Sequence, residues 1–258
     1  LPPLIECMLT DRDASDTAVI ALRAYGSAAV PALVEAFPGA SRRGKARIVG
    51  LLRAIPDDRG LPALIAAMGD PDPAIRKEAV RIWGCDPLRS RAPVLVIPLA
   101  GLLKDGDAET ARWAANWLGL IGDRRAVRPL VSSLGRDFEY DTEAIGALGR
   151  IGDPESLGPV VRDLRRLAAL LEKERVPRGA VPAARPGSAP VMVGSSTDHL
   201  ETEVERALQA FPRIGGGACG PVIPLLREGD PVLRKWGAVL LGGIGDESAA
   251  RHLEAGLN

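Results

Sequence analysis

The sequence predicts an all-α chain in which about seven helix pairs stack as a right-handed α-α superhelix (α-solenoid). Three observations lead to this fold class. A short phrase recurs at a period of about 31 residues, which indicates an array of supersecondary units. Proline and glycine occupy equivalent places in each repeat. Aromatic residues make up only 3% of the chain, so the apolar content is mostly Ala, Leu, Val and Ile, which suits closely packed helices.

The repeated phrase is clearest in the second half of the chain. Asp123 and Asp153, which hold the same place in two copies, are 30 residues apart. The clear copies are "LGLIGDRRAVRPL" (118–130), "LGRIGDPESLGPV" (148–160) and "LGGIGDESAARHL" (241–253), and weaker copies are "AYGSAAVPALV" (24–34) and "AIPDDRGLPALI" (54–65). The phrase is therefore a repeat junction and not a single phosphate-binding loop, which would be expected once and after a strand.

Each repeat is expected to contain two helices. The first begins with an apolar-Pro-x-apolar pattern, because a missing N–H is tolerated in the first helical turn. The prolines at this place are Pro31, Pro62, Pro98, Pro129, Pro159 and Pro224. The second helix begins after an acidic turn and ends at a glycine, which takes the left-handed conformation without penalty.

The cadence "ALGxIGD...AVxPLIxxL" resembles the short HEAT-like repeat first associated with phycobilisome lyases, over nearly the whole chain. The resemblance implies an α-solenoid of HEAT-like helix pairs whose concave face binds a partner. Arg76, Arg112 and Arg234, which stand near the acidic turns, resemble the ladder of HEAT repeats, so we expect them to link neighbouring repeats. Proteins with this repeat include bilin lyase subunits, HEAT-like DNA glycosylases, a di-iron hydroxylase and many scaffolds. The motif is thus specific for the fold and leaves the function open.

We predict a single domain over residues 1–258, with a Pro/Gly/Ser-rich insertion at 176–198. Helical periodicity resumes within the same repeat at 199–211, so the insertion is not a domain boundary. Two roles remain open for it. It is either a flexible spacer or a segment that folds back across the concave face.

Aligning the repeats separates core positions in the second helix from open ones. One column contains only apolar residues: Leu22, Leu52, Trp83, Leu118, Leu148, Phe211 and Leu241. The column of Trp117 is also apolar, so Trp83 and Trp117 are expected to be core. Two other columns are chemically mixed and three residues apart, so they form one stripe on the helix. They contain Thr17, Arg47, Glu78, Trp113, Glu143, Arg206 and Trp236, and Ile20, Gly50, Arg81, Asn116, Gly146, Gln209 and Val239.

A stripe that varies from repeat to repeat on the inner helix of a solenoid is where recognition is expected. Tryptophans among polar neighbours suit binding, because they offer a large contact area and one donor. The alternative is that each tryptophan covers a junction with the adjacent repeat. Acids near Tyr140 could likewise receive a basic partner, or complement the helix dipole. The predicted partner-binding stripe comprises Arg81, Trp113, Asn116, Tyr140, Glu143, Arg206, Gln209 and Trp236.

Composition argues against several kinds of chemistry. Lys plus Arg and Asp plus Glu each number 33, so the net charge of zero gives no general attraction to nucleic acid or anionic membrane. With two His and three Cys that lack metal-ligand spacing, we expect no metal, no cofactor and no catalytic residue. The sparse cysteines favour a reducing compartment, and the default location is the cytoplasm.

These observations predict a non-catalytic scaffold that binds another protein through its concave face, without a membrane or nucleic acid as partner. The alternative is a HEAT-like-repeat enzyme or enzyme subunit. The resemblance admits a bilin lyase-like protein, whose tetrapyrrole the Trp stripe could hold. It also admits a DNA glycosylase-like enzyme, although the balanced charge does not favour a basic channel for DNA.

Overall fold

A computed structural model describes residues 1–10, 15–55, 57–81, 93–174, 196–211 and 219–245. Every regular element within these ranges is a helix, so the predicted all-α fold is confirmed. The chain divides into two compact units, Leu1–Ala126 and Val127–Asn258. Trp83 and residues 176–195 of the predicted insertion lie outside the described ranges.

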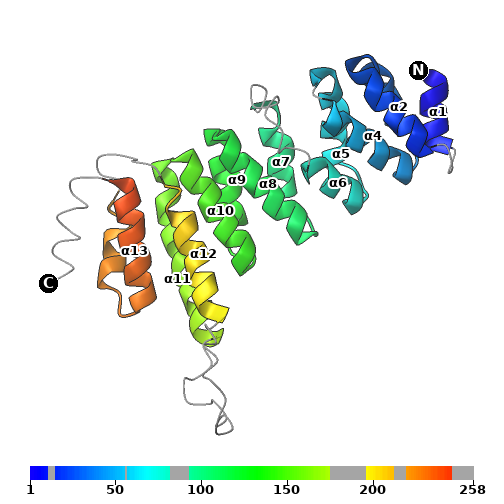
Figure 1. Ribbon diagram of the computed structural model, residues 1–258. Helices are drawn as coiled ribbons and strands as arrows, with labels where there is room; N and C mark the ends of the chain where they lie inside the picture. Colours follow the sequence, from blue (N-terminus) through cyan, green and yellow to red (C-terminus); the bar gives the residue numbers. More distant parts are fainter. Residues whose placement is uncertain (11–14, 56, 82–92, 175–195, 212–218, 246–258) are drawn as a thin grey trace, which may run out of the picture. The chain divides into compact units, whose positions relative to one another are not determined.

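The first unit consists of consecutive helix pairs, drawn from dark blue to green in Figure 1. Second helices pack on second helices of the neighbouring pairs, so that α2 contacts α4, α4 contacts α6 and α6 contacts α8. This order of contacts is that of an α-solenoid. The helices are α1 (Pro2–Thr10), α2 (Ser15–Tyr25), α3 (Val30–Ala36), α4 (Arg42–Ala54), α5 (Leu61–Met68), α6 (Pro73–Val80), α7 (Val96–Leu102) and α8 (Ala108–Ile121).

The second unit repeats the arrangement with a longer first helix. Its second helices are α10, α12 and α13, and α12 packs on both of the others (Figure 1). The helices are α9 (Val127–Ser133), α10 (Phe138–Ile151), α11 (Leu157–Glu174), α12 (Ser196–Leu208), the short 3-10 helix η7 (Ile223–Arg227) and α13 (Pro231–Ile244). The first three residues of α12, 196–198, lie within the predicted insertion.

The ends of the second helices follow from the sequence. A side-chain oxygen just before each of five helices accepts a hydrogen bond from a first-turn N–H, which satisfies a donor that has no partner within the helix. These N-caps are Ser41, Asp72, Asp107, Asp137 and Asp230. At the other end, Gly122, Gly152 and Gly245 have φ of 71°, 70° and 64°, the left-handed conformation expected of a glycine stop.

The core lies on the faces that successive helices turn toward each other. The apolar column of the second helices is buried wherever it is described, at Leu22, Leu52, Leu118, Leu148, Phe211 and Leu241. The prolines of the first helices lie in their first turns, as in α3 and α5. Burial of one leucine side chain per repeat contributes about 2 kcal/mol before conformational entropy is subtracted.

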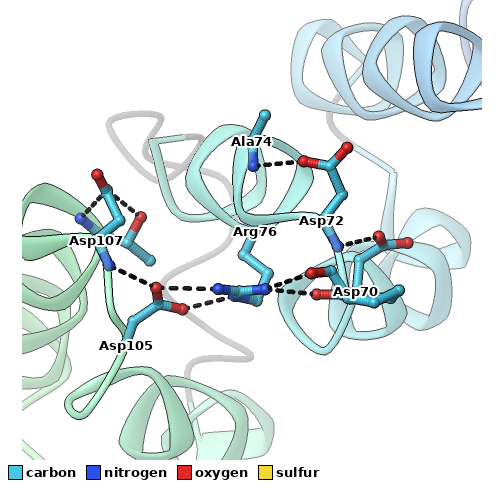
Figure 2. A network of polar contacts seen from close by, with 8 residues as sticks. Asp70, Asp72, Ala74, Arg76, Asp105 and Asp107 are labelled. Carbon is cyan, nitrogen blue, oxygen red and sulfur yellow. Dashed lines mark hydrogen bonds and ion pairs between the residues drawn. The ribbon is translucent and has the colours of Figure 1, made fainter.

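A second contact between repeats is ionic and joins the second helices α4 and α6 to the loop before the next second helix. Figure 2 shows Arg76 of α6 donating to both carboxylate oxygens of Asp105, at 2.6 and 3.1 Å. Its remaining donors bind the carbonyls of Asp70 and Pro71, at 2.9 and 3.0 Å. One repeat earlier, Lys45 of α4 binds Asp70 at 2.7 Å. We call this series the ionic ladder.

The acids of the ionic ladder also shape their own loops. Asp70 and Asp105 each stand two residues before an N-cap, and each accepts a hydrogen bond from the N–H of that N-cap residue at 2.9 Å (Figure 2). The hydrogen bonds from Arg76 hold the pKa of the Asp105 carboxyl below its usual value, against the opposing effect of burial. The predicted linking role of Arg76 is therefore confirmed.

The described contacts of Arg234 stay within its own repeat. Its Nη1 donates to the carbonyls of Glu228 and Gly229, at 2.7 and 2.9 Å. These carbonyls hold the same places in the loop as those that Arg76 binds in its own repeat. The contacts of Arg76 within its repeat therefore recur at Arg234.

In the second unit, α10 and α12 approach each other closely through glycine. A Cβ built on Gly149 would stand 2.8 Å from the Phe211 ring and 3.1 Å from the Ala210 carbonyl carbon. A Cβ on Gly146, one turn earlier, would lie 3.5 Å from that of Ala207. The absence of a side chain at Gly149 is thus a packing requirement and not a turn requirement.

Replacing Gly149 by Ala is expected to destabilise the second unit by about 1 to 3 kcal/mol, because the added methyl overlaps Phe211 and backbone that cannot move freely. The matched control is Gly242→Ala in α13, where a Cβ meets nothing within 4 Å. That control should stabilise by roughly 0.5 to 1 kcal/mol through helix propensity. Urea unfolding measures both, and equal stabilisation by the two variants would disprove the close approach.

Replacing Arg76 by Ala is expected to cost about 2 to 4 kcal/mol, because it leaves the largely buried carboxylate of Asp105 without its cation. The control is Arg43→Ala. Arg43 is exposed on α4, so this change should alter the free energy of unfolding by less than about 0.5 kcal/mol. Thermal or urea unfolding compares them. A loss no greater for Arg76 than for Arg43 would show that the ionic ladder does not hold the repeats together.

Candidate binding surfaces

Two residues of the predicted stripe in the first unit lie on α8. Trp113 is 38% exposed, and Asn116, one turn along, is half-buried. Leu120, seven residues after Trp113 and therefore on the same face, is 45% exposed. A tryptophan and a leucine thus stand partly in solvent on one face of α8, whereas the other large exposed apolar side chains of this unit, Ile20, Tyr25, Val94 and Ile97, lie on other elements. We call Trp113, Asn116 and Leu120 the α8 face.

Leu120 was not among the predicted site residues, although the sequence held a signal for it. Its column contains Ala24, Ala54, Leu120, Arg150 and Gly243. This column is as chemically mixed as the two columns that form the predicted stripe, and none of its described members is buried. Extending the stripe by one further turn would have included it.

Ion pairs between α6 and α8 border the α8 face. Lys77 of α6 pairs with Glu109 of α8, and this contact is the main cause that raises the pKa of Lys77 and lowers that of Glu109. The indole N–H of Trp113 lies 3.4 Å from Glu109 Oε1. Arg81 ends α6 and is exposed. The Trp113 ring is therefore held at the edge of a fixed charge pair, with a guanidinium nearby.

The second unit places its predicted residues on α10 and α12. Arg206 is exposed on α12, and Gln209 is exposed just after its end. Glu143 is half-buried and pairs with Arg150 two turns along α10, at 3.1 Å. Between them Gly146 is buried, because Ala207 of α12 packs against it. This surface is polar, unlike the α8 face.

The prediction that Tyr140 is exposed is wrong, because its side chain is fully buried. It stands three residues after its N-cap, in the column of Gly44, Ile75, Thr110 and Leu233, all of which are buried. Its hydroxyl donates to Ser133 Oγ at 2.5 Å, so the polar atom is satisfied inside the unit. Burial accordingly raises the pKa of Tyr140. Tyr140 is a core residue.

The prediction that Trp236 is exposed is also wrong. It holds the same place in α13 as Trp113 holds in α8, yet it is fully buried. It lies four residues from Val232 and from Leu240, both of which are buried as well. The three side chains form one apolar face, and α13 packs on α12 and η7. The same repeat position is therefore open in α8 and closed in α13, because the neighbours differ.

Trp117, which was predicted to be core, is half-buried. Its indole N–H donates to the carbonyl of Val80 at 2.9 Å, across the junction from α8 to α6. That carbonyl belongs to the last turn of α6, whose final carbonyls have no partner within the helix. Trp117 therefore has a structural role, and part of its ring reaches the surface beside the α8 face.

Among the described residues, no group of three or more His, Cys, Asp or Glu side chains is arranged to hold a metal ion. Cys219 is buried, and His199 pairs with Glu203 on the same helix at 3.4 Å.

Within the described part of the chain, no single helix has the length and apolarity to cross a membrane. One pair of helical segments, Asp16–Ala28 and Val30–Ala36, has the length and composition of a membrane span only when the two are taken together, and they are bent by 117° relative to each other.

Comparison with protein families adds one match. Residues 97–180, which begin in α7 and run past the end of α11, match the family model for HEAT repeats. This part of the chain therefore contains HEAT repeats. The helix pairs, the stacked second helices and the Arg76 contact agree with that match. No curated protein matches the chain. The match is to HEAT repeats in general, and the phycobilisome-lyase type stays a prediction.

The two tryptophans at one repeat position allow a direct test of these surfaces. Trp113→Ala should cost less than about 1 kcal/mol of unfolding free energy, because the ring is already partly in solvent. Trp236→Ala should cost roughly 3 to 5 kcal/mol, because it empties a large site in the core. Chemical unfolding of both variants gives the comparison. Similar losses would mean that the α8 face is core and not a free surface.

Proposed function

We propose that the chain is a non-catalytic scaffold whose HEAT repeats bind another protein through the exposed faces of their second helices. The single observation that supports this most is the exposure of Trp113 together with Leu120 on α8. Solenoid repeats are stabilised by contacts with adjacent repeats alone, which leaves the remaining face of each second helix available for a partner.

The α8 face is the apolar centre of the proposed surface. Tryptophan is enriched among the residues that dominate binding energy, and such residues are surrounded by polar contacts that exclude water. Here Asn116 lies on the same face, and the Lys77–Glu109 pair and Arg81 stand at the rim. The α8 face costs the repeat little in folding, since other repeats have Thr, Arg or Glu where Trp113 stands.

The polar residues Glu143, Arg206 and Gln209 are a second contact region, carried by the other unit. Rim charges of this kind affect the association rate and its salt dependence more than the final affinity. We therefore expect replacement of Arg206 or Gln209 to weaken binding less than replacement of Trp113.

Affinity purification from the native source tests the proposal, with the wild-type chain, Trp113→Ala, and Ile97→Ala as matched control. Ile97 is 75% exposed but lies on the first helix α7, away from the predicted stripe. Trp113→Ala should lower the affinity of the recovered protein by about 2 kcal/mol or more, roughly 30-fold, and Ile97→Ala should leave it unchanged.

Other outcomes of the same purification would contradict the proposal. Loss of the partner with Ile97→Ala and not with Trp113→Ala would place the interface on the first helices. A bound tetrapyrrole would support a bilin lyase-like role, and bound DNA a glycosylase-like one. Because both tryptophan and isoleucine variants alter exposed side chains, their unfolding free energies should match that of the wild type and exclude misfolding as the cause.

A further inference from the structure

A group of charged side chains lies buried between α10 and α11 in the second unit. Asp141 of α10 is fully buried and Asp163 of α11 is 7% exposed. Arg166 of α11 reaches both: its Nε donates to Asp163 Oδ1 at 2.8 Å, and its Nη2 pairs with Asp141 Oδ2. Within the described part of the chain, two buried carboxyl groups thus share one guanidinium. We call Asp141, Asp163 and Arg166 the buried triad.

The two carboxyl groups of the buried triad differ in how well they are satisfied. Asp141 Oδ1 accepts hydrogen bonds from the backbone N–H groups of Gly135 and Arg136, at 3.0 and 3.3 Å, so both of its oxygens have partners. Asp163 Oδ2 is buried and has no hydrogen-bond partner. A buried ionised oxygen without a partner is costly, so the group lowers its energy by taking a proton.

The charge at Asp141 is itself a departure from the other repeats. Its position, four residues after the N-cap, holds Lys45 and Arg76 in the first unit and Arg234 in α13. In those repeats a cation binds loop carbonyls or the next acid, whereas Asp141 binds loop N–H groups and takes its cation from α11. Asp163 therefore shares the Arg166 guanidinium with Asp141, and one of its own carboxyl oxygens has no partner.

We propose that Asp163 acts as a proton-operated switch that controls how firmly α11 packs on α10. When Asp163 is neutral, Arg166 balances Asp141 and the buried triad carries no net charge. When Asp163 is ionised, the buried triad carries one uncompensated negative charge and an oxygen without a partner. The packing of α11 on α10 is then weaker. This inference concerns the second unit alone and does not depend on the proposed binding role.

The charged groups around α11 do not offset the excess negative charge of the buried triad. The elements that pack against α11 are α10, α13 and the short 3-10 helix η6 (Pro154–Ser156). Their charged groups, together with the residues just before them, are Arg136, Asp137, Glu139, Asp141, Glu143 and Arg150 at α10, Asp153 and Glu155 at η6, and Asp230, Arg234 and Lys235 at α13. Arg162 of α11 is exposed. On α11 itself, Arg165 pairs with Glu228 at the surface, at 2.9 Å. Most of these groups are acidic.

The pH at which the switch operates follows from burial, which raises the pKa of Asp163 from an ordinary 3.8 to about 6. Because the pKa in the folded chain exceeds that in the unfolded chain, the stabilisation is complete below about pH 4 and is lost as the pH rises through about 6. A shift of about two pH units corresponds to a change of about 100-fold in the local opening equilibrium.

Hydrogen exchange of the full chain tests the switch at pH 4.5 and pH 7.5, after correction for the intrinsic pH dependence of exchange. In the wild type, amides of α11 should lose protection by up to about 100-fold at the higher pH. Asp163→Asn, which keeps an acceptor for Arg166 but cannot ionise, should show little change. The control Glu155→Gln removes an exposed carboxylate from η6 and should behave as the wild type.

A second measurement covers the case in which Asp163→Asn does not fold. Titration of the Asp163 carboxyl carbon by NMR in the wild-type chain should give a midpoint near 6. A midpoint below about 4 would overturn the proposal, because the carboxylate would then be ionised over the whole range in which the chain is folded. Equal pH dependence of α11 protection in the wild type and in Asp163→Asn would overturn it as well.

Discussion

The ionic ladder fixes the register between successive repeats of the first unit. Apolar contacts between helices are not directional, so on their own they allow one repeat to slide or rotate against the next. The bidentate contact of Arg76 with Asp105 has a defined geometry, and the same guanidinium binds the Asp70 and Pro71 carbonyls of its own loop. One side chain therefore joins a helix, the loop before it and the loop of the following repeat. The positions of Trp113 and Trp117 on α8 depend on this register.

Departures from the ladder coincide with the features that distinguish individual repeats. Helix α8 has Ala111 where α6 has Arg76, and Ala111 is fully buried, so this turn is held by packing and by the Asp107 cap. Helix α10 has Asp141 at the same place and recruits Arg166 from α11. A repeat protein can change one such position without losing its fold, because each repeat depends mainly on its neighbours. The result is the buried triad, in which Asp141 of α10 and Asp163 of α11 share Arg166 and the Asp163 carboxyl titrates.

Packing of the second helices decides which repeat positions can serve recognition. Glycine at 146 and 149 lets α12 approach α10, which closes the stripe there and leaves Arg206 and Gln209 on the outside. On α8 the stripe stays open enough for Trp113 and Leu120 to reach solvent. The α8 face is thus a local property of one repeat within a shared architecture. This is consistent with scaffolds in which a few repeats supply most of the binding energy.

Local physics explains why much of the fold could be predicted. The period, the N-cap acids such as Asp72 and Asp107, the glycine stops such as Gly122, and the apolar column through Leu118 each depend on a few neighbouring residues, and all are found as expected. The linking role of Arg76 was likewise predictable, since its acidic partner stands near the start of the next second helix. The mixed column also predicted the exposure of Trp113, although the same argument failed for Trp236.

Tertiary structure alone decided the remainder. Trp113 and Trp236 hold the same repeat position, and no local signal distinguishes them. Trp236 is buried because the apolar face it shares with Val232 and Leu240 is covered in the packing of α13 on α12 and η7. The acids that surround Tyr140 in the sequence predict a surface residue, yet its hydroxyl binds Ser133 inside the unit. The buried triad joins residues 25 apart on two helices. Which face of a helix is covered depends on its neighbours in space, and a repeat period does not contain that information.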